Sequence, residues 1–187
     1  MAQEIDSMTP EKAALFAETF LAAVKKEWLT TKRVLAAVPP EQCRYRPHPN
    51  SRSALELVWH IASVDVWFLD GFLQAKFELE DDDNIPADFK DSNDVLAWYE
   101  DSFPAKLDEV AKLSPEVWAT PIPFFEIFNL PAVMYLQFML FHTIHHRGQL
   151  TAYLRPMGAK VPSIYGGSFD EPMALPDCPA EFQSRLG

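Results

Sequence analysis

Three of the five histidines in this chain fall in one short tract, as His142, His145 and His146. Each residue of an α-helix advances about 100° around the axis, so on a helix His142 and His146 lie about 40° apart on one face. Two imidazoles at i, i+4 emerge side by side and can bind one metal ion. His145 borders that face on the other side of His142. The spacing predicts a pair of metal ligands on one helix.

His60 is the natural third ligand for such a site. It lies in the middle of another apolar segment with helical periodicity, flanked by Leu57 and Val64. Metal sites in helical bundles are built from side chains on facing helices. Three neutral imidazoles suit Zn²⁺, Ni²⁺ or another borderline divalent ion, and they leave coordination positions open. An open site of this kind favours Lewis-acid chemistry or activation of a bound nucleophile.

The histidines also have an interpretation without a metal, as hydrogen-bonded residues of the core. Two other metal chemistries are disfavoured. The chain has no CxxCH haem-attachment motif, and a di-iron site needs Glu-x-x-His pairs, whereas Glu56 precedes His60 by four residues. Cys43 and Cys178 are weak candidates for a nucleophile, because neither lies beside a histidine motif.

Several residues near the histidine tract are candidates for a supporting role. Gln149 and Tyr153 project toward the predicted metal side, where they could orient a substrate or pack in the core with an internal hydrogen bond. His145 is the only nearby residue that could add a fourth ligand. Arg147 and Arg155 face away from that side, and we interpret them as packing or ion-pairing residues.

Four apolar segments with helical periodicity must position these side chains. The first begins at Thr9-Pro10, an N-cap followed by proline, and stops before Pro39. The second begins with a capping box, Ser53 and Glu56, and ends near Gln74.

The third segment spans residues 92–112, and Pro104 is expected to kink or split it. The fourth begins near Pro131 and runs to about Arg155, with Gly158 as a left-handed C-cap. Between them, residues 114–130 are rich in proline and aromatic residues and predict a short strand pair or an extended loop.

This pattern predicts an all-α fold, a four-helix bundle with a long crossover connection. We expect one domain over residues 1–187, in which residues 159–187 form an extended tail.

Composition and charge exclude several classes of function. The net charge of −11 makes the chain a poor partner for nucleic acid or for anionic membranes. The sequence contains no run of about 18 apolar residues, so we expect no transmembrane helix. The acidic N-terminus does not resemble a signal peptide. Two distant cysteines fit a reducing compartment. We therefore expect a cytoplasmic protein.

The same motifs resemble the DinB-like (damage-inducible) superfamily. The C-terminal signature is carried by residues 142–150, 153–158 and 161–166, and the signature around the second helix by residues 45–53 and 56–60. The resemblance covers roughly residues 21–165. It implies a four-helix bundle, a divalent metal held by His60, His142 and His146, and a homodimer.

Relatives in this superfamily include enzymes that use low-molecular-weight thiols for transfer or isomerisation, beside many members without a known activity. The resemblance therefore implies a metal-dependent transferase or hydrolase that acts on a small molecule, with one Ni²⁺ or Zn²⁺ ion and a thiol cofactor. The alternative is a non-catalytic metal-binding protein of the stress or damage response. A catalytic site keeps a coordination position open, whereas a structural site is closed by a fourth protein ligand. A role in DNA repair conflicts with the acidic charge.

Overall fold

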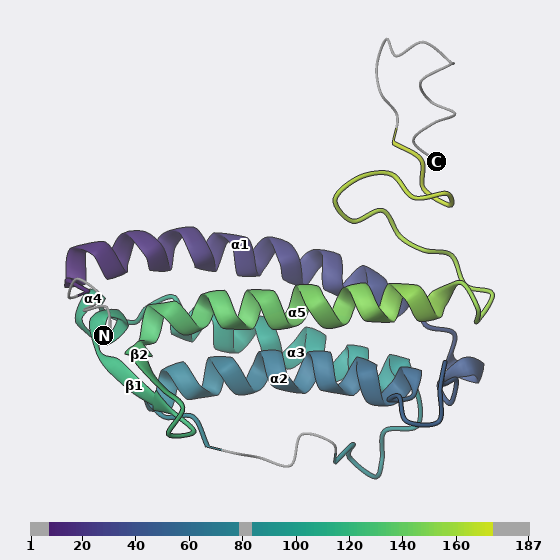
Figure 1. Cartoon of the computed structure of the whole chain (residues 1–187), viewed down its shortest axis with the longest axis horizontal. Coiled ribbons are helices and arrows are strands. Elements are labelled where there is room, and N and C mark those ends of the chain that lie inside the picture. Colours follow the sequence, from purple (N-terminus) through teal and green to yellow (C-terminus); the bar gives the residue numbers. More distant parts are fainter. Residues whose placement is uncertain (1–7, 79–83, 174–187) are drawn as a thin grey trace.

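Four long helices form the body of the molecule in the computed structural model, which describes residues 8–78 and 84–173 (Figure 1). They are α1 (Pro10–Ala36), α2 (Ala54–Gln74), α3 (Ser92–Val110) and α5 (Ala132–Leu154). Shorter elements are the 3₁₀ turn η1 (Pro40–Gln42), the helix α4 (Pro115–Ala119) and the strands β1 (Pro121–Phe124) and β2 (Phe128–Pro131). The predicted all-α bundle is confirmed.

The first two long helices begin where local capping chemistry places them. The Thr9 side chain accepts a hydrogen bond from the backbone N–H of Lys12 at the start of α1. At the start of α2, Ser53 and Glu56 form both hydrogen bonds of a capping box. These bonds satisfy N–H groups that a helix start leaves unpaired. Glu56 is thus a capping residue, as predicted.

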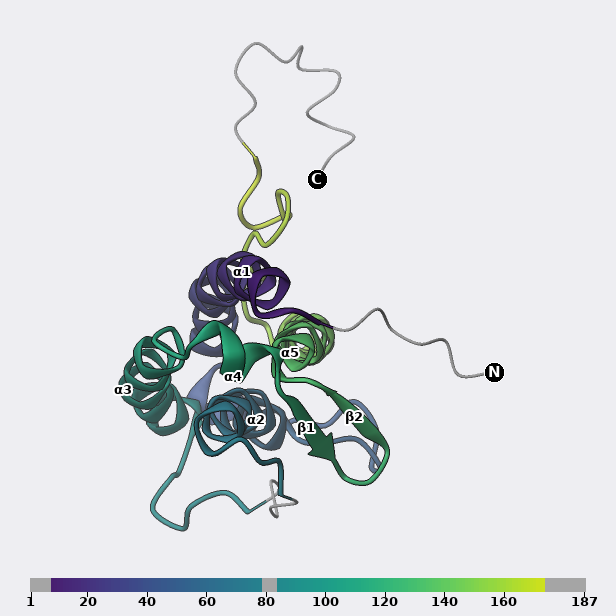
Figure 2. The same ribbon diagram turned by 90° about the vertical axis from the view of Figure 1, so that its left-hand side faces the viewer.

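The order of helices around the bundle is α1, α5, α2 and α3, as the end-on view shows (Figure 2). Helices α2 and α3 are neighbours that run in the same direction, so the chain between them crosses the length of the bundle (Figure 1). This is the predicted crossover connection. Helices α2 and α5 are also neighbours but antiparallel, which places the first half of α2 beside the second half of α5.

Pro104 does not split α3, which continues from Ser92 to Val110. A proline inside a helix leaves the carbonyl of the residue four positions earlier without its N–H partner. Here that residue is Glu100, which is exposed, so water can bind the freed carbonyl. The neighbouring Tyr99 and Phe103 are fully buried and hold this part of the helix against the core.

The aromatic segment before α5 contains the predicted strand pair. Strands β1 and β2 pair antiparallel, with Pro121 opposite Pro131 and Phe124 opposite Phe128. The Tyr135 hydroxyl, on the first turn of α5, donates to the Ile122 carbonyl at 2.7 Å. This hydrogen bond fixes the hairpin against the start of α5.

The chain leaves α5 through Gly158, which has the positive φ of 76° expected of a left-handed residue. Residues 159–173 contain no helix or strand, which agrees with the predicted extended tail over the part that is described. Arg33 pairs with Glu171, and Arg155 pairs with Asp170, so two ion pairs attach the tail to the bundle. Within residues 8–78 and 84–173, no helix has the length and apolar character needed to cross a membrane.

Candidate metal centre

Three histidine side chains converge where the first half of α2 lies against the second half of α5. The Nε2 atom of His60 lies 3.0 Å from Nε2 of His142 and 3.2 Å from Nε2 of His146. One nitrogen from each ring falls within 4.8 Å of the other two. The structure therefore brings together the three residues that the sequence singled out as metal ligands.

The helices account for this convergence. His142 and His146 are one turn apart on α5, so their rings project in the same direction. The antiparallel packing of α2 brings His60 to the same level from the opposite side. His60 is only 7% exposed, and its neighbours Trp59 and Ile61 belong to the core, so packing limits the movement of its ring.

The two short distances are compatible with a shared metal ion as well as with hydrogen bonds between the rings. Tetrahedral coordination at about 2.0–2.1 Å would place ligand nitrogens about 3.3 Å apart. Each imidazole nitrogen has a single in-plane position, which is either an N–H or a lone pair. Nε2 of His60 can therefore make one good hydrogen bond, yet it faces two nitrogens at close range. A cation between the three rings would satisfy both contacts.

The surroundings also keep the rings in the neutral form that binds metals. Burial, together with the charges of His146 and His60, lowers the pKa of His142 to about 3. Burial likewise lowers the pKa of His146, although the hydrogen bond to Gln149 opposes the shift. Since a metal displaces protons from its ligands, a site that is already deprotonated has less to release on binding.

Gln149 lies where a supporting residue is needed. Its Oε1 atom is 3.0 Å from Nδ1 of His146. When that nitrogen carries the proton and donates to the amide oxygen, Nε2 keeps its lone pair toward the other two histidines. By contrast, Nδ1 of His142 is buried without a hydrogen-bond partner among the described residues. Gln149 thus contacts a candidate ligand directly.

The other two candidates for a supporting role do not join the triad. Tyr153 is buried, and its hydroxyl donates to the backbone carbonyl of Arg52 at 3.3 Å. It therefore links α5 to the segment before α2. His145 is exposed, and its ring centre lies 4.8 Å from that of His146, but it is not part of the ligand group.

Arg147 faces away from the histidines, as the helical spacing predicts, and it is a packing and ion-pairing residue of the core. It is 1% exposed and pairs with Glu27 of α1 at 2.6 Å. It also donates to the hydroxyls of Thr31 and Tyr165. The Tyr165 hydroxyl therefore contacts both members of this ion pair.

The sequence reasoning missed Asp65, a carboxylate buried between the helices. Its oxygens accept hydrogen bonds from the hydroxyls of Tyr99, at 2.5 Å, and of Thr143. Burial raises the pKa of Asp65 from 3.8 to about 7. The available signal was an acid flanked by Val64 and Val66 in an apolar run.

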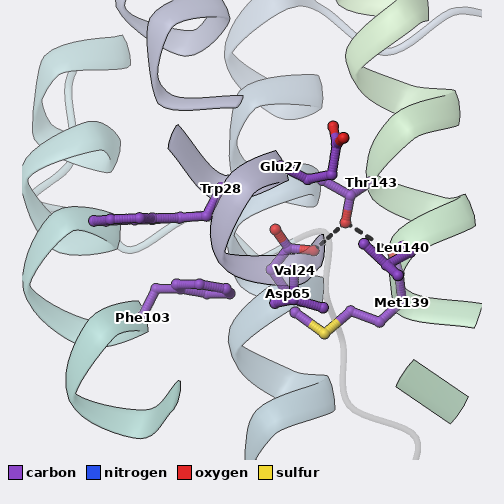
Figure 3. Close-up of a pocket in the computed structure, with 8 residues that line it drawn as sticks. All are labelled: Val24, Glu27, Trp28, Asp65, Phe103, Met139, Leu140 and Thr143. Carbon is purple, nitrogen blue, oxygen red and sulfur yellow. Dashed lines mark hydrogen bonds between the residues drawn. The ribbon is translucent and has the colours of Figure 1, made fainter. Parts of the chain in front are cut away.

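Figure 3 shows Asp65 and Thr143 beside a small cavity between the helices. Its volume of about 10 Å³ suits a single water molecule. The lining residues come from α1, α2, α3 and α5: Val24, Glu27, Trp28, Asp65, Phe103, Met139, Leu140 and Thr143. The Asp65 cluster therefore lies inside the core, and the cavity beside it is too small to admit a substrate.

Cys43 is not a member of the ligand group. Cys43 is buried, and its sulfur accepts a hydrogen bond from the backbone N–H of Ser92 at 3.3 Å. This contact is structural, since it joins the loop after α1 to the start of α3. Cys178 lies outside the described residues.

Comparison with known proteins finds similarity to one family. The model of the DinB family matches residues 8–179. A DinB-like protein from Bacillus cereus is 26% identical with a TM-score of 0.66, and one from Bacillus subtilis is 22% identical with a TM-score of 0.65. Each alignment covers 79% of this chain and 97% of the other. At 22% identity the second likeness concerns the fold alone. No curated protein matches the sequence.

Proposed function

Because the chain belongs to the DinB family and carries a buried triad of histidines, we propose that it binds one divalent ion, Ni²⁺ or Zn²⁺, through His60, His142 and His146. The observation that carries this proposal is the position of His60 Nε2. It lies 3.0 and 3.2 Å from two other ring nitrogens, although it can make only one good hydrogen bond.

We further propose that the site is catalytic and serves a metal-dependent transferase or hydrolase that uses a low-molecular-weight thiol. Among the described residues the ligand group has three members, and His145 stays outside it. This arrangement supports a coordination position open to a substrate. A bound ion would act as a Lewis acid and lower the pKa of a thiol or water beside it.

The residues of the chain itself would prepare the site. Gln149 holds the ring of His146 in the tautomer that presents Nε2. The buried surroundings of His60 and His142 exclude bulk water from one side of the triad and keep both rings in place. The non-catalytic alternative, a structural metal in a stress-response protein, requires a fourth protein ligand.

We also propose that the protein forms a homodimer, acts on a small molecule, has no nucleic-acid or membrane partner, and is located in the cytoplasm. The homodimer rests on the family resemblance and is tested by sedimentation of the metal-loaded protein. The others rest on the acidic charge and on the motifs.

Metal content per chain tests the proposed site. Tag-free protein is incubated with Zn²⁺ or Ni²⁺, desalted and analysed for metal, together with the variants His142→Ala and His145→Ala. We expect about one equivalent in the wild type and in His145→Ala, and little in His142→Ala. No metal in the wild type would overturn the triad as a metal site.

Cobalt-substituted protein then separates the catalytic function from the structural one. Co²⁺ has a visible spectrum that responds to its ligands, so an added thiol such as 2-mercaptoethanol changes the spectrum when a position is open. An unchanged spectrum at saturating thiol, or loss of metal in His145→Ala, would favour the closed, structural site.

A further inference from the structure

Trp28 on α1 carries a buried polar atom that no described residue satisfies. Its indole ring stacks on Phe103 of α3, with ring centres 5.7 Å apart, and the Lys32 ammonium lies 4.3 Å from the ring centre. The Nε1 atom is buried and has no hydrogen-bond partner among the described residues. A buried N–H without an acceptor destabilises the folded state, so an acceptor is expected beside it.

The same side chain lines the cavity of about 10 Å³ between the helices, together with Asp65 and Thr143 (Figure 3). A cavity of this size holds one water molecule when it offers the water roughly two to four polar partners. The lining offers the indole N–H of Trp28 as a donor and the side-chain oxygens of Asp65 and Thr143 as acceptors. The partners that a single water needs are therefore present.

Asp65 keeps the capacity to accept a further hydrogen bond. Its Oδ2 atom accepts from Tyr99 and its Oδ1 atom from Thr143, whereas a carboxyl group has lone pairs for more than these two bonds. The other carboxylate among the lining residues, that of Glu27, is already paired with Arg147. A donor inside the cavity therefore finds its acceptor at Asp65.

We propose that this cavity is a binding site for one internal water molecule, which accepts the N–H of Trp28 and donates to the carboxyl group of Asp65. The site takes water and not a metal cation, because an indole nitrogen donates a hydrogen bond but offers no lone pair to a cation. This inference is independent of the metal proposed at the histidine triad.

The water makes Asp65 a common hydrogen-bond partner of the four long helices. Asp65 itself belongs to α2, and its two hydroxyl partners, Tyr99 and Thr143, belong to α3 and α5. The water adds Trp28 of α1. Because an internal water with several partners is part of the folded structure, this one stabilises the packing of α1 against the other three helices.

Magnetisation transfer between water and the Trp28 indole tests the site by NMR in the full-length, isotope-labelled protein. The Trp28 Hε1 signal is assigned through the backbone, and its cross-peaks with water are recorded in NOESY and ROESY spectra. A bound water gives cross-peaks of opposite sign in the two spectra, whereas exchange of the N–H with solvent gives the same sign. We expect opposite signs at Trp28. The absence of a cross-peak, or a cross-peak from exchange alone, would overturn the proposal.

A cavity-filling variant and a matched control then locate the water. Val24 lines the cavity and is 3% exposed, so the added methyl group of Val24→Ile takes the space of the water. We expect this variant to lose the water cross-peak of Trp28 and to shift its Hε1 signal upfield, because the N–H loses its acceptor. Val34→Ile should keep the cross-peak, since Val34 is also buried on α1 but does not line the cavity. A cross-peak that persists in Val24→Ile, or that is lost equally in both variants, would contradict a water at this place.

Discussion

Nε2 of His60 on α2 and Nε2 of His142 on α5 lie 3.0 Å apart, although 82 residues separate them along the chain. A pair of buried imidazoles this close in a core is held there by the packing of two antiparallel helices. His146 completes the group from the next turn of α5.

Removal of the hydrogen bond behind His146 should weaken metal binding. In Gln149→Leu the Nδ1 atom of His146 loses its acceptor, so the ring is no longer fixed in one tautomer. We expect the affinity for Zn²⁺ to fall about 10- to 100-fold, as is typical for partners of metal ligands. Competition with a chromophoric chelator measures the change. Gln149→Glu keeps an acceptor and should retain binding, and equal affinity in Gln149→Leu would contradict the assigned role.

Chelation of the metal should lower the thermal stability of the protein. An ion that binds only the folded state stabilises it by about 2.7 kcal/mol at a free concentration one hundred times the dissociation constant. For a chain of this size that corresponds to roughly 5–10 °C in Tm. Calorimetry with and without EDTA checks this. His142→Ala serves as the control, because its Tm should not respond to EDTA.

The buried Asp65 carboxyl should make stability depend on pH. Its pKa rises from 3.8 to about 7 on folding, so the folded state holds a proton that the unfolded state releases. The contribution of this group is fully present below about pH 4, and it is lost as the pH rises to about 7. In Asp65→Asn the side chain is neutral throughout.

Urea denaturation at pH 5 and at pH 8 therefore compares the two proteins. From pH 5 to pH 8 the free energy of unfolding of the wild type should fall relative to that of Asp65→Asn, on the order of a few kcal/mol. All other ionisable groups are common to both proteins, so their effect cancels in the difference. A difference that does not change with pH would show that Asp65 keeps an ordinary pKa.

Substitution of the buried Arg147 should lower the free energy of unfolding far more than substitution of an exposed arginine. Arg147→Met leaves Glu27 without its cationic partner at a site where the arginine is 1% exposed, and we expect a cost of about 3–5 kcal/mol. The double variant Arg147→Met, Glu27→Gln should recover part of that loss.

Arg155→Met is the matched control for this experiment. Arg155 pairs with Asp170 on the surface, where its side chain is 52% exposed, so we expect a change within about 1 kcal/mol. Urea denaturation of the three variants gives the comparison. Equal losses in Arg147→Met and Arg155→Met would contradict the structural role of the buried pair.

Much of this molecule could be predicted from local sequence alone. The caps at Thr9 and Ser53 satisfy helix N–H groups within three residues, so the helix starts follow from the sequence. The pairing of His142 with His146 on one face follows from the helical repeat. The crossover topology and the short strand pair were also anticipated.

The tertiary structure alone decided the features that join distant segments. Spacing suggested His60 as a ligand, but only the antiparallel contact of α2 with α5 places its nitrogen beside those of α5. The sequence does not show that Asp65 and Arg147 are buried, whereas the packing of the helices leaves each only 1% exposed. The local rule predicts that Pro104 kinks or splits its helix, but α3 continues through it and the buried Tyr99 and Phe103 hold this part of the helix against the core. Caps and helical faces depend on neighbours a few residues away, whereas burial and distances between side chains depend on how whole helices pack.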